Sequence, residues 1–506
     1  MKVGKIYSNK NNKLMKKYIF VVIVFSLYIV HLNSQSQNSN WLFGFNDTLY
    51  KENCGINIWY EDSNEISFEF VKTPLNFEST MAAISDTSGN LLLYTNGCDI
   101  ADASHDIIKN GGGLNPGYFY EQVCGKTGYI VPNGAMFIPY PNIDNRYILL
   151  HLGAEHDNTS SIKNTTFYYS VIEHVNGKFE VLEKNQILLN EDIESFAVVR
   201  HGNGTDWWIF LPEYQTNRYF RFLLNQNGIE EKESQYIGWE LPNNLCKLAG
   251  LSAFSPDGNK YLRYNRSCGY QLFDFNRCSG LLSNFIYESV GYIVDDLSSD
   301  FVFSPDSKYI FINKLDHRRF NSKSYINKMY RVAIDEIGTK AKPFSEYELP
   351  YSLHFNRFYN SFNGKIYVLN SNSSEYIVEI VTLDGTDALE FTQYKLHVSN
   401  ARTVPYFANF NLHEIDCDQV NTNNHITESL ILYPNPISDY LNIDISNINN
   451  INQISILSIT GQNLFSKKIK ENLKVVKINM QNFKSGLYVI EAKGENNIII
   501  KKVIKI

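Results

Sequence analysis

Turn-forming residues and short hydrophobic segments alternate along most of the chain. Four times, a cluster of small or turn-forming residues leads directly into a segment of aromatic and β-branched side chains with partial alternation. The pairs are 83–90 with 91–94, 254–259 with 260–264, 303–308 with 309–312, and 361–364 with 365–369. Pro and Gly in such clusters favour tight turns, because Pro restricts φ and Gly accepts positive φ. The pattern therefore predicts β-hairpins and little helix.

The spacing of these hairpins predicts how they are arranged. With weaker examples near 134–152 and 202–211, one unit recurs about every 45–60 residues between Trp41 and Glu414. That period is typical of a four-stranded propeller blade. We predict an all-β protein in which residues 37–416 form a β-propeller of about seven blades. An elongated array of β-sandwiches is the alternative.

The two ends of this region are hydrophobic and strand-like, at residues 41–45 and 407–412. A propeller has to close its ring, and many do so by pairing strands from both termini in one blade. Closure also removes exposed sheet edges, which would otherwise promote aggregation. We therefore predict that these two segments pair with each other.

The last part of the chain predicts a separate, smaller domain. Its candidate strands are 441–445, 453–459, 475–479, 486–492 and 497–504. Together they predict a small Ig-like antiparallel β-sandwich over residues 429–506. Residues 417–428 before it are polar and rich in Asn, which predicts a linker that proteases can reach.

The N-terminus has the composition of a targeting segment. Residues 1–36 contain six Lys and no acidic residue, with a largely apolar run at 18–30. The small polar residues Ser34 and Ser36 follow this run. Basic residues, a short apolar core and small residues in this order predict a secretory signal peptide. The apolar run is too short for a comfortable membrane span.

Charge is distributed unevenly between the parts of the chain. The whole sequence has a formal net charge of −7. Residues 429–506 contain ten Lys against five acidic residues, so that residues 37–428 carry a net charge of −18. Such an acidic region argues against nucleic acid as a partner, because phosphates attract Lys and Arg. It favours solubility, divalent cations or basic partners.

Seven cysteines in an exported chain predict disulfides. They are Cys54, Cys98, Cys124, Cys246, Cys268, Cys278 and Cys417. Cys268 and Cys278 bracket a strand-like segment, and we predict a possible disulfide between them; Cys98 with Cys124 is the other candidate pair. No CxxC pair is present, which argues against a zinc site.

The chain has no specific catalytic or metal-binding motif. His151, Glu155 and His156 have the spacing H-x-x-x-E-H, one residue longer than the inverted zinc-protease motif. Gly153 lies between them and disfavours the helix that would place two ligands on one face. We therefore expect a strand at this position and no metal site.

Two further segments have a structural and a functional interpretation. Asp86, Ser88 and Asn90 resemble the start of a calcium loop, but the distant bidentate Glu is missing. A surface calcium ion is therefore not supported by a motif, and we expect no cofactor. Trp207 and Trp208 follow a turn cluster, where an aromatic pair can form a platform for carbohydrate. Adjacent strand residues point to opposite faces, so we expect one ring in the core and one partly exposed.

The order of motifs near the C-terminus resembles the C-terminal sorting domain (type A) that the type IX secretion system recognises. The residues that carry the resemblance are Tyr433, Pro434, Asn435, Pro436, Gly461, Gly486, Tyr488, Lys501 and Lys502. The resemblance implies that the type IX machinery transports the protein across the outer membrane. It further implies that the tail is then cleaved off or attached to surface lipopolysaccharide.

The body resembles propeller-like surface proteins that carry type IX sorting tails in gliding bacteria. The resemblance rests on residues 40–46 (NWLFGFN), 85–97 (SDTSGNLLLYTNG) and 401–410 (ARTVPYFANF). It implies a surface location and no established enzymatic activity.

These observations lead to two hypotheses about function. We expect a secreted or cell-surface protein whose non-catalytic propeller binds a glycan or protein ligand, in adhesion or gliding motility. The alternative is a secreted hydrolase or lyase with its site in the central channel of the propeller. That alternative requires acidic, His or Tyr side chains from several blades to converge in the channel.

Overall fold

A computed structural model of the protein describes residues 36–44, 56–61, 66–156, 162–241, 250–265, 268–288, 300–316, 326–337, 344–348, 355–361, 364–370, 374–382, 389–400, 406–417, 430–433, 437–445, 451–458, 462–469, 473–494 and 498–505. Residues 1–35 of the predicted signal peptide and residues 418–428 of the predicted linker lie outside this part of the chain. The helices within it are the short η1 (Ser36–Asn38), α2 (Tyr118–Val123) and η3 (Ile334–Glu336). None of them is long and apolar enough to cross a membrane.

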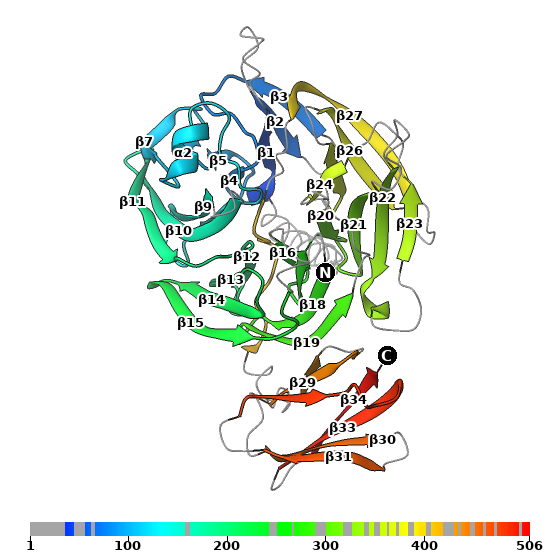
Figure 1. The fold of residues 1–506 in the computed structure, drawn as a ribbon. Coiled ribbons are helices and arrows are strands. Elements are labelled where there is room, and N and C mark those ends of the chain that lie inside the picture. Colours follow the sequence, from blue (N-terminus) through cyan, green and yellow to red (C-terminus); the bar gives the residue numbers. More distant parts are fainter. Residues whose placement is uncertain are drawn as a thin grey trace, which may run out of the picture.

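The described residues form seven antiparallel blades in a ring, followed by a separate sandwich (Figure 1). Blades 1 to 3 contain β1 (Asn40–Phe43), β2 (Ile56–Glu61) and β3 (Ile66–Val71); β4 (Ala82–Ser85), β5 (Leu91–Thr95), β6 (Asp99–Asp102) and β7 (Ile107–Gly112); and β8 (Ala135–Pro139), β9 (Arg146–His156), β10 (Ile162–Val175) and β11 (Lys178–Leu189). Blades 4 and 5 contain β12 (Ala197–Arg200), β13 (Trp207–Pro212), β14 (Arg218–Asn225) and β15 (Gly228–Tyr236); and β16 (Leu251–Phe254), β17 (Lys260–Asn265), β18 (Gly269–Asn276) and β19 (Leu281–Glu288). Blades 6 and 7 contain β20 (Asp300–Phe303), β21 (Tyr309–Asp316), β22 (Ile326–Ala333) and β23 (Phe344–Glu348); and β24 (Phe355–Asn360), β25 (Ile366–Asn370), β26 (Ser374–Thr382) and β27 (Leu389–Asn400). The predicted all-β propeller is therefore confirmed.

Blades 2 and 3 are joined at the rim of the ring. Their outermost strands β7 and β11 make a parallel pair at Lys109 and Glu180, which merges the two blades into one eight-stranded sheet. The same residues form an ion pair with a distance of 2.6 Å between Lys109 Nζ and Glu180 Oε2. Blade 3 has the longest strands of this sheet, of 11 to 14 residues.

The turn clusters seen in the sequence form the hairpins between the first and second strands of the blades. Between β16 and β17, Ser255 Oγ lies 2.5 Å from Asp257 Oδ1 and accepts a hydrogen bond from the backbone N of Lys260 at 2.9 Å. Between β20 and β21, Ser304 Oγ donates in the same way to Asp306 Oδ1, at 2.6 Å. The Ser and Asp side chains thus satisfy backbone groups that the ladder leaves free at a turn.

Aromatic side chains fill the spaces between neighbouring blades. Between blades 4 and 5, the ring of Tyr261 lies 5.8 Å from that of Phe210 and 5.9 Å from that of Tyr219. All three side chains are fully buried. Each such ring pair adds roughly 0.5–1.5 kcal/mol beyond the burial of its area. This packing explains the high aromatic content of the sequence.

The predicted pairing of residues 41–45 with 407–412 is wrong. Strand β1 pairs only with β2, and the described residues after β27 that include 407–412 form no strand. Blades 7 and 1 meet through side chains instead: Trp41 is fully buried, and its ring lies 3.9 Å from Tyr359 and 5.4 Å from Tyr367. A buried aromatic cluster replaces the hydrogen-bonded closure that the hydrophobic pattern suggested.

Residues 406–417, here called the crossing segment, run from the ring axis to blades 4 and 5. At the axis, Phe407 lies 6.0 Å from the ring of Tyr359 in blade 7. The hydroxyl of Tyr406, next to it, donates to the carbonyl O of Phe196 beside blade 4 at 2.5 Å. Farther along, the backbone N of Ile415 donates to Gly202 O at 2.7 Å. The segment therefore connects opposite sides of the ring.

The C-terminal domain is a sandwich of two sheets. One sheet contains β28 (Ile431–Tyr433), β29 (Tyr440–Asp444) and β32 (Val475–Asn479), and the other contains β31 (Asn463–Lys468), β30 (Ile451–Ser458), β33 (Gly486–Gly494) and β34 (Ile498–Lys505), in these orders. The five predicted strands agree with the observed ones to within two residues, and β28 and β31 are additional. The core between the sheets is aliphatic, with Leu441, Ile456 and Ile490 fully buried.

Candidate functional site

The central channel, where the enzymatic alternative places its site, contains a small cavity beside one of about 330 Å³ that shares Tyr359, Asn360 and Phe407 with it. The small cavity has a volume of about 140 Å³ and lies between the innermost strands β16, β20 and β24 and the crossing segment. Tyr406 and Phe407 line it and occupy the axis of the ring. Sites for small molecules are typically about 300–1,000 Å³, so the cavity is small for a substrate.

The one acidic side chain that lines this cavity, Asp300, has its oxygens engaged by its surroundings. Asp300 Oδ1 accepts a hydrogen bond from the backbone N of Phe301 at 2.8 Å. Asp300 Oδ2 accepts one from the backbone N of Phe358 at 3.1 Å and lies 4.0 Å from Arg357 Nη1. These contacts join blades 6 and 7. The carboxylate therefore acts as a connector between blades rather than as a group poised for chemistry.

A second ionised pair lies between blades 4 and 5. Arg263 Nε donates to Glu194 Oε2 at 2.8 Å, and both side chains are fully buried. The guanidinium donates further to the carbonyl O of Thr216 at 2.5 Å and of Glu213 at 2.8 Å. Gly250 is required beside this pair, because an added Cβ would lie 2.5 Å from Glu194 Oε2. The pair is closed to solvent and has a structural role.

The spaced histidines of β9 do not converge. His151 is fully buried, with Nδ1 2.7 Å from Asn115 Oδ1 and Nε2 3.1 Å from Ser170 Oγ. Burial lowers the pKa of this imidazole to about 3, so it is neutral at physiological pH. His156 is five residues further along the strand and therefore on the opposite face. Within the described ranges, no group of three His, Cys, Asp or Glu side chains has the arrangement of a metal site.

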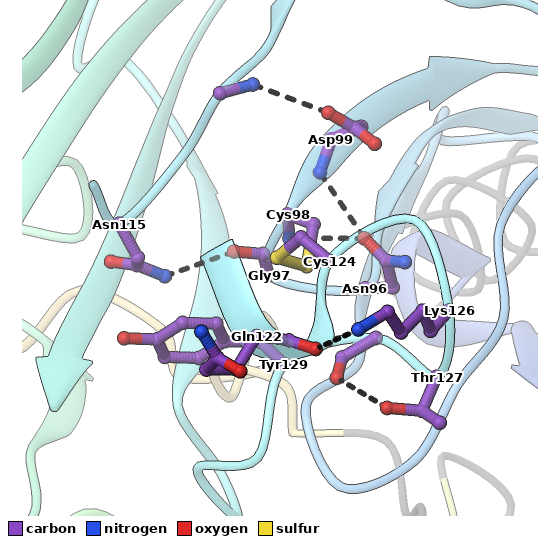
Figure 2. The surroundings of a disulfide bond; sticks show 12 residues. Asn96, Gly97, Cys98, Asp99, Asn115, Gln122, Cys124, Lys126, Thr127 and Tyr129 are labelled. Carbon is purple, nitrogen blue, oxygen red and sulfur yellow. Dashed lines mark hydrogen bonds between the residues drawn. A yellow bond between two sulfur atoms is a disulfide. The ribbon is translucent and has the colours of Figure 1, made fainter. Parts of the chain in front are cut away.

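Asn115 links this histidine to the first disulfide. Figure 2 shows Asn115 Nδ2 donating to the carbonyl O of Gly97, at 3.0 Å, beside the bond between Cys98 and Cys124. On the other side of Cys98, Asn96 Oδ1 accepts hydrogen bonds from the backbone N of Cys98 and of Asp99 (Figure 2). The disulfide thus anchors the loop that carries α2 to blade 2. The pair Cys98–Cys124, one of the two predicted candidates, is confirmed.

The predicted disulfide between Cys268 and Cys278 is wrong. Cys278 is bonded to Cys417, with Cα atoms 5.6 Å apart, across 139 residues of sequence. Cys268 is also disulfide-bonded. Cys268 and Cys278 lie at opposite ends of β18, which at about 3.3 Å per residue places them roughly 30 Å apart. A disulfide requires Cα atoms within about 7 Å.

The aromatic pair Trp207–Trp208 is part of the core on both faces of β13. The two side chains are 1% and 4% exposed. Arg200 covers Trp207 at 4.7 Å from its ring, and Trp208 Nε1 donates to the carbonyl O of Arg277 at 2.8 Å. The expectation that one ring is partly exposed is therefore wrong, and neither ring forms a platform for carbohydrate. Asp86 Oδ1 accepts from the backbone N of Ser88 and of Asn90, which is the turn that we expected.

The residues predicted to carry the sorting signal lie in different parts of the C-terminal sandwich. Tyr488 is buried in β33, where its hydroxyl donates to Lys484 O at 2.6 Å. Gly486 opens the same strand with φ of 157°, beside open space. Lys501 pairs with Ile490 in the ladder, and burial lowers the pKa of its amine.

Two of the remaining residues belong to described strands of the sandwich. Lys502 pairs with Val489, and Tyr433 is in β28. Pro434, Asn435, Pro436 and Gly461 lie outside the described residues, as do Cys54 and Cys246.

The fold and these residues define a class: a β-propeller cargo followed by an export domain. Residues 431–506 match the family described as the secretion system C-terminal sorting domain. This sorting domain implies export through the type IX secretion system to the cell exterior. No curated protein matches the chain in sequence.

Several solved structures are similar to this chain. They include a putative 6-phosphogluconolactonase from Bacteroides uniformis, at 12% identity and a TM-score of 0.37, over 71% of this chain and 98% of that one. PorZ, a surface component of the type IX secretion system of Porphyromonas gingivalis, has 12% identity and a TM-score of 0.30, over 92% and 70%. The periplasmic gluconolactonase PpgL of Pseudomonas aeruginosa has 10% identity and a TM-score of 0.33, over 87% and 98%. These likenesses concern the fold alone.

Proposed function

We propose that this exported protein is a non-catalytic binding module whose propeller contacts a partner outside the cell. The observation that carries the proposal is the central channel, where Tyr406 and Phe407 leave a cavity of about 140 Å³. Asp300, the acidic residue in its lining, is held by two backbone N–H groups. A cavity of this size, whose acidic lining residue already accepts two backbone hydrogen bonds, is better suited to stability than to turnover.

The outer surface is therefore the proposed binding region. The net charge of −18 over residues 37–428 favours a partner that presents basic groups. Apolar side chains are exposed on the outermost strand of blade 3, where Leu182 and Ile187 are 45% and 62% exposed. Such side chains beside charged ones are typical of a protein or glycan contact. We propose that this rim takes part in adhesion or gliding, without a cofactor or metal.

The test is binding of the purified exported protein to envelope and matrix fractions, to a glycan array and to basic proteins. We expect retention on at least one class of ligand, unchanged by EDTA and weakened by Ile187→Glu. Leu464→Glu is the matched control, since Leu464 is 43% exposed but belongs to the sorting domain. The absence of binding to every class would contradict the proposal.

A broad screen with glycan, ester and peptide substrates tests the enzymatic alternative. We expect no turnover above that of a heat-inactivated sample. Turnover that disappears in Asp300→Asn, but persists in the turn variant Asp306→Asn, would place a reaction in the channel and overturn the proposal. The folded state of both variants is checked by their thermal unfolding.

The fate of the tail at the cell surface is part of the proposal. We propose that the protein is either cleaved within residues 417–428 or attached through its tail to lipopolysaccharide. Mass spectrometry of the C-terminal peptide from the surface-exposed protein distinguishes these outcomes. A surface form that ends at an unmodified Ile506 would contradict both.

A further inference from the structure

The short strand β28 sends alternate side chains into two different domains. Leu432 is buried in the aliphatic core of the sorting domain. Tyr433, the next residue, is 7% exposed and packs with the aromatic cluster of blades 4 and 5, which includes Phe273. Its ring lies 6.4 Å from that of Phe285 in β19, at an interplanar angle of 87°. Adjacent strand residues point to opposite faces, so one strand joins both cores.

Polar side chains surround the Tyr433 hydroxyl. Asn217 and Glu240 of the propeller and Asp444 of the sorting domain lie near the phenol. Burial is the main reason that the pKa of Tyr433 is raised to about 12, and the two carboxylates add to it. The phenol therefore remains a neutral hydrogen-bonding group. A buried ring with polar groups near its hydroxyl is typical of an anchor residue at a protein interface.

Charges of opposite sign face each other around this anchor. A cleft of about 840 Å³ separates the two domains beside Tyr433. Its propeller wall includes Glu233, Glu240 and Arg221, and its sorting-domain wall includes Lys474, Lys477 and Asp444. The prevailing signs match the net charges of the two regions, −18 and +5. Attraction across such a solvated cleft orients the domains more than it holds them.

The contact also determines which face of the sorting domain is free. All contacts described above come from the sheet β28–β29–β32. Figure 1 shows β29 next to the propeller, while β30 and β31 of the other sheet lie on the far side. The four-stranded sheet, which includes Tyr488 and Lys501, is thus directed away from the cargo.

We propose that the propeller is a docking partner for its own sorting domain, with Tyr433 as the anchor. The full-length chain, with its two domains docked, then presents the four-stranded sheet of the sorting domain to the export machinery. The Cys278–Cys417 disulfide complements this arrangement, because it holds the crossing segment on the propeller up to the first residue of the linker. Docking is independent of what the propeller binds after export.

Hydrogen exchange of the intact, full-length chain tests the docking. Tyr433→Ser should raise amide exchange in β19 and β28 by about 30-fold, the effect of losing an anchor residue. Exchange in β30 and β33 should stay unchanged, because their core does not include Tyr433. Small-angle scattering should show a larger maximum dimension for the variant. Leu464→Ser is the control and should have no effect, since Leu464 is 43% exposed and belongs to β31 of the other sheet.

A variant on the propeller side makes the test independent of the folding of the sorting domain. Phe285→Ser should raise exchange in β28 while leaving β30 and β33 protected. Unchanged exchange in β19 with Tyr433→Ser would overturn the proposal. A rise throughout the sorting domain would do the same, because Tyr433 would then belong to that domain's own core.

Discussion

The guanidinium of Arg263 donates from Nε to Glu194 Oε2 at 2.8 Å, and neither side chain is exposed to solvent. This pair connects β17 of blade 5 to the residue stretch that leads into blade 4. Burying two charges is costly, and their attraction offsets the cost only when both are present. The stability of the propeller should therefore fall when either partner of this pair is replaced.

The first prediction concerns this pair. Arg263→Met should lower the free energy of unfolding by about 3–5 kcal/mol, because it leaves the Glu194 carboxylate buried without its counter-charge. Urea unfolding followed by fluorescence measures the change. Lys109→Met at the exposed pair with Glu180 is the control, with an expected loss of about 1 kcal/mol or less. Equal effects of the two substitutions would contradict the structural role of Arg263.

The second prediction concerns His151 and pH. The pKa of its imidazole is about 3 in the folded protein, below the ordinary value of 6.5. As pH falls below about 6.5, the unfolded chain takes up the proton before the folded one does. The stability that the neutral imidazole contributes is complete above that pH and is lost between about pH 6.5 and 3, at about 1.4 kcal/mol per pH unit.

His151→Gln removes this titration, so the free energy of unfolding should depend less steeply on pH between about 6.5 and 4. Unfolding in urea at a series of pH values measures the slope. His174→Gln, at an exposed position of β10 in the same blade, should retain the slope of the original protein. Parallel curves for the original protein and His151→Gln would show that folding does not lower the pKa of this imidazole.

The third prediction concerns the second disulfide. Peptide mapping without reduction should recover Cys278 linked to Cys417, and no peptide in which Cys268 is linked to Cys278. Cys278→Ser should reduce stability by roughly 2–4 kcal/mol, because the bond closes a loop of 139 residues. The crossing segment should then become accessible to proteases near residue 417. Protection equal to that of the intact disulfide would show that side-chain packing alone holds the segment.

The fourth prediction concerns export. Deletion of residues 430–506 should abolish surface delivery and leave the propeller in the periplasm, because the match to the sorting family lies in that stretch. Fractionation with an antibody against the propeller measures the distribution. Tyr440→Ser, which changes only an exposed ring of the sorting domain, serves as the control. Surface delivery of the truncated chain would contradict the sorting role of the tail.

The local features of the chain were predictable because they depend on short-range chemistry. Ser255, Asp257 and the equivalent residues of other blades satisfy backbone groups a few residues away, and so the turns are visible in the sequence. Strands of the sorting domain agree with the prediction for the same reason. The repeat of such units at a constant spacing predicted the propeller.

Contacts between distant residues were not predictable in this way. Cys278 was assigned to a near neighbour in sequence, but its true partner is brought close only by the path of residues 406–417 across the ring. Closure of the ring by Trp41 against Tyr359, rather than by strand pairing, depends on the shape of the last blade. The burial of both Trp207 and Trp208 follows from neighbours on either side of blade 4.

Sequence by itself determined the all-β class, the propeller and the export domain, because each follows from residue patterns within a few tens of positions. Only the tertiary structure decided that the channel is nearly filled, how the cysteines pair and where Tyr433 points. Those properties depend on which surfaces meet when the ring closes. Leu432 and Tyr433 are neighbouring apolar positions in the sequence, and their order alone does not tell which side chain enters its own core and which the neighbouring domain.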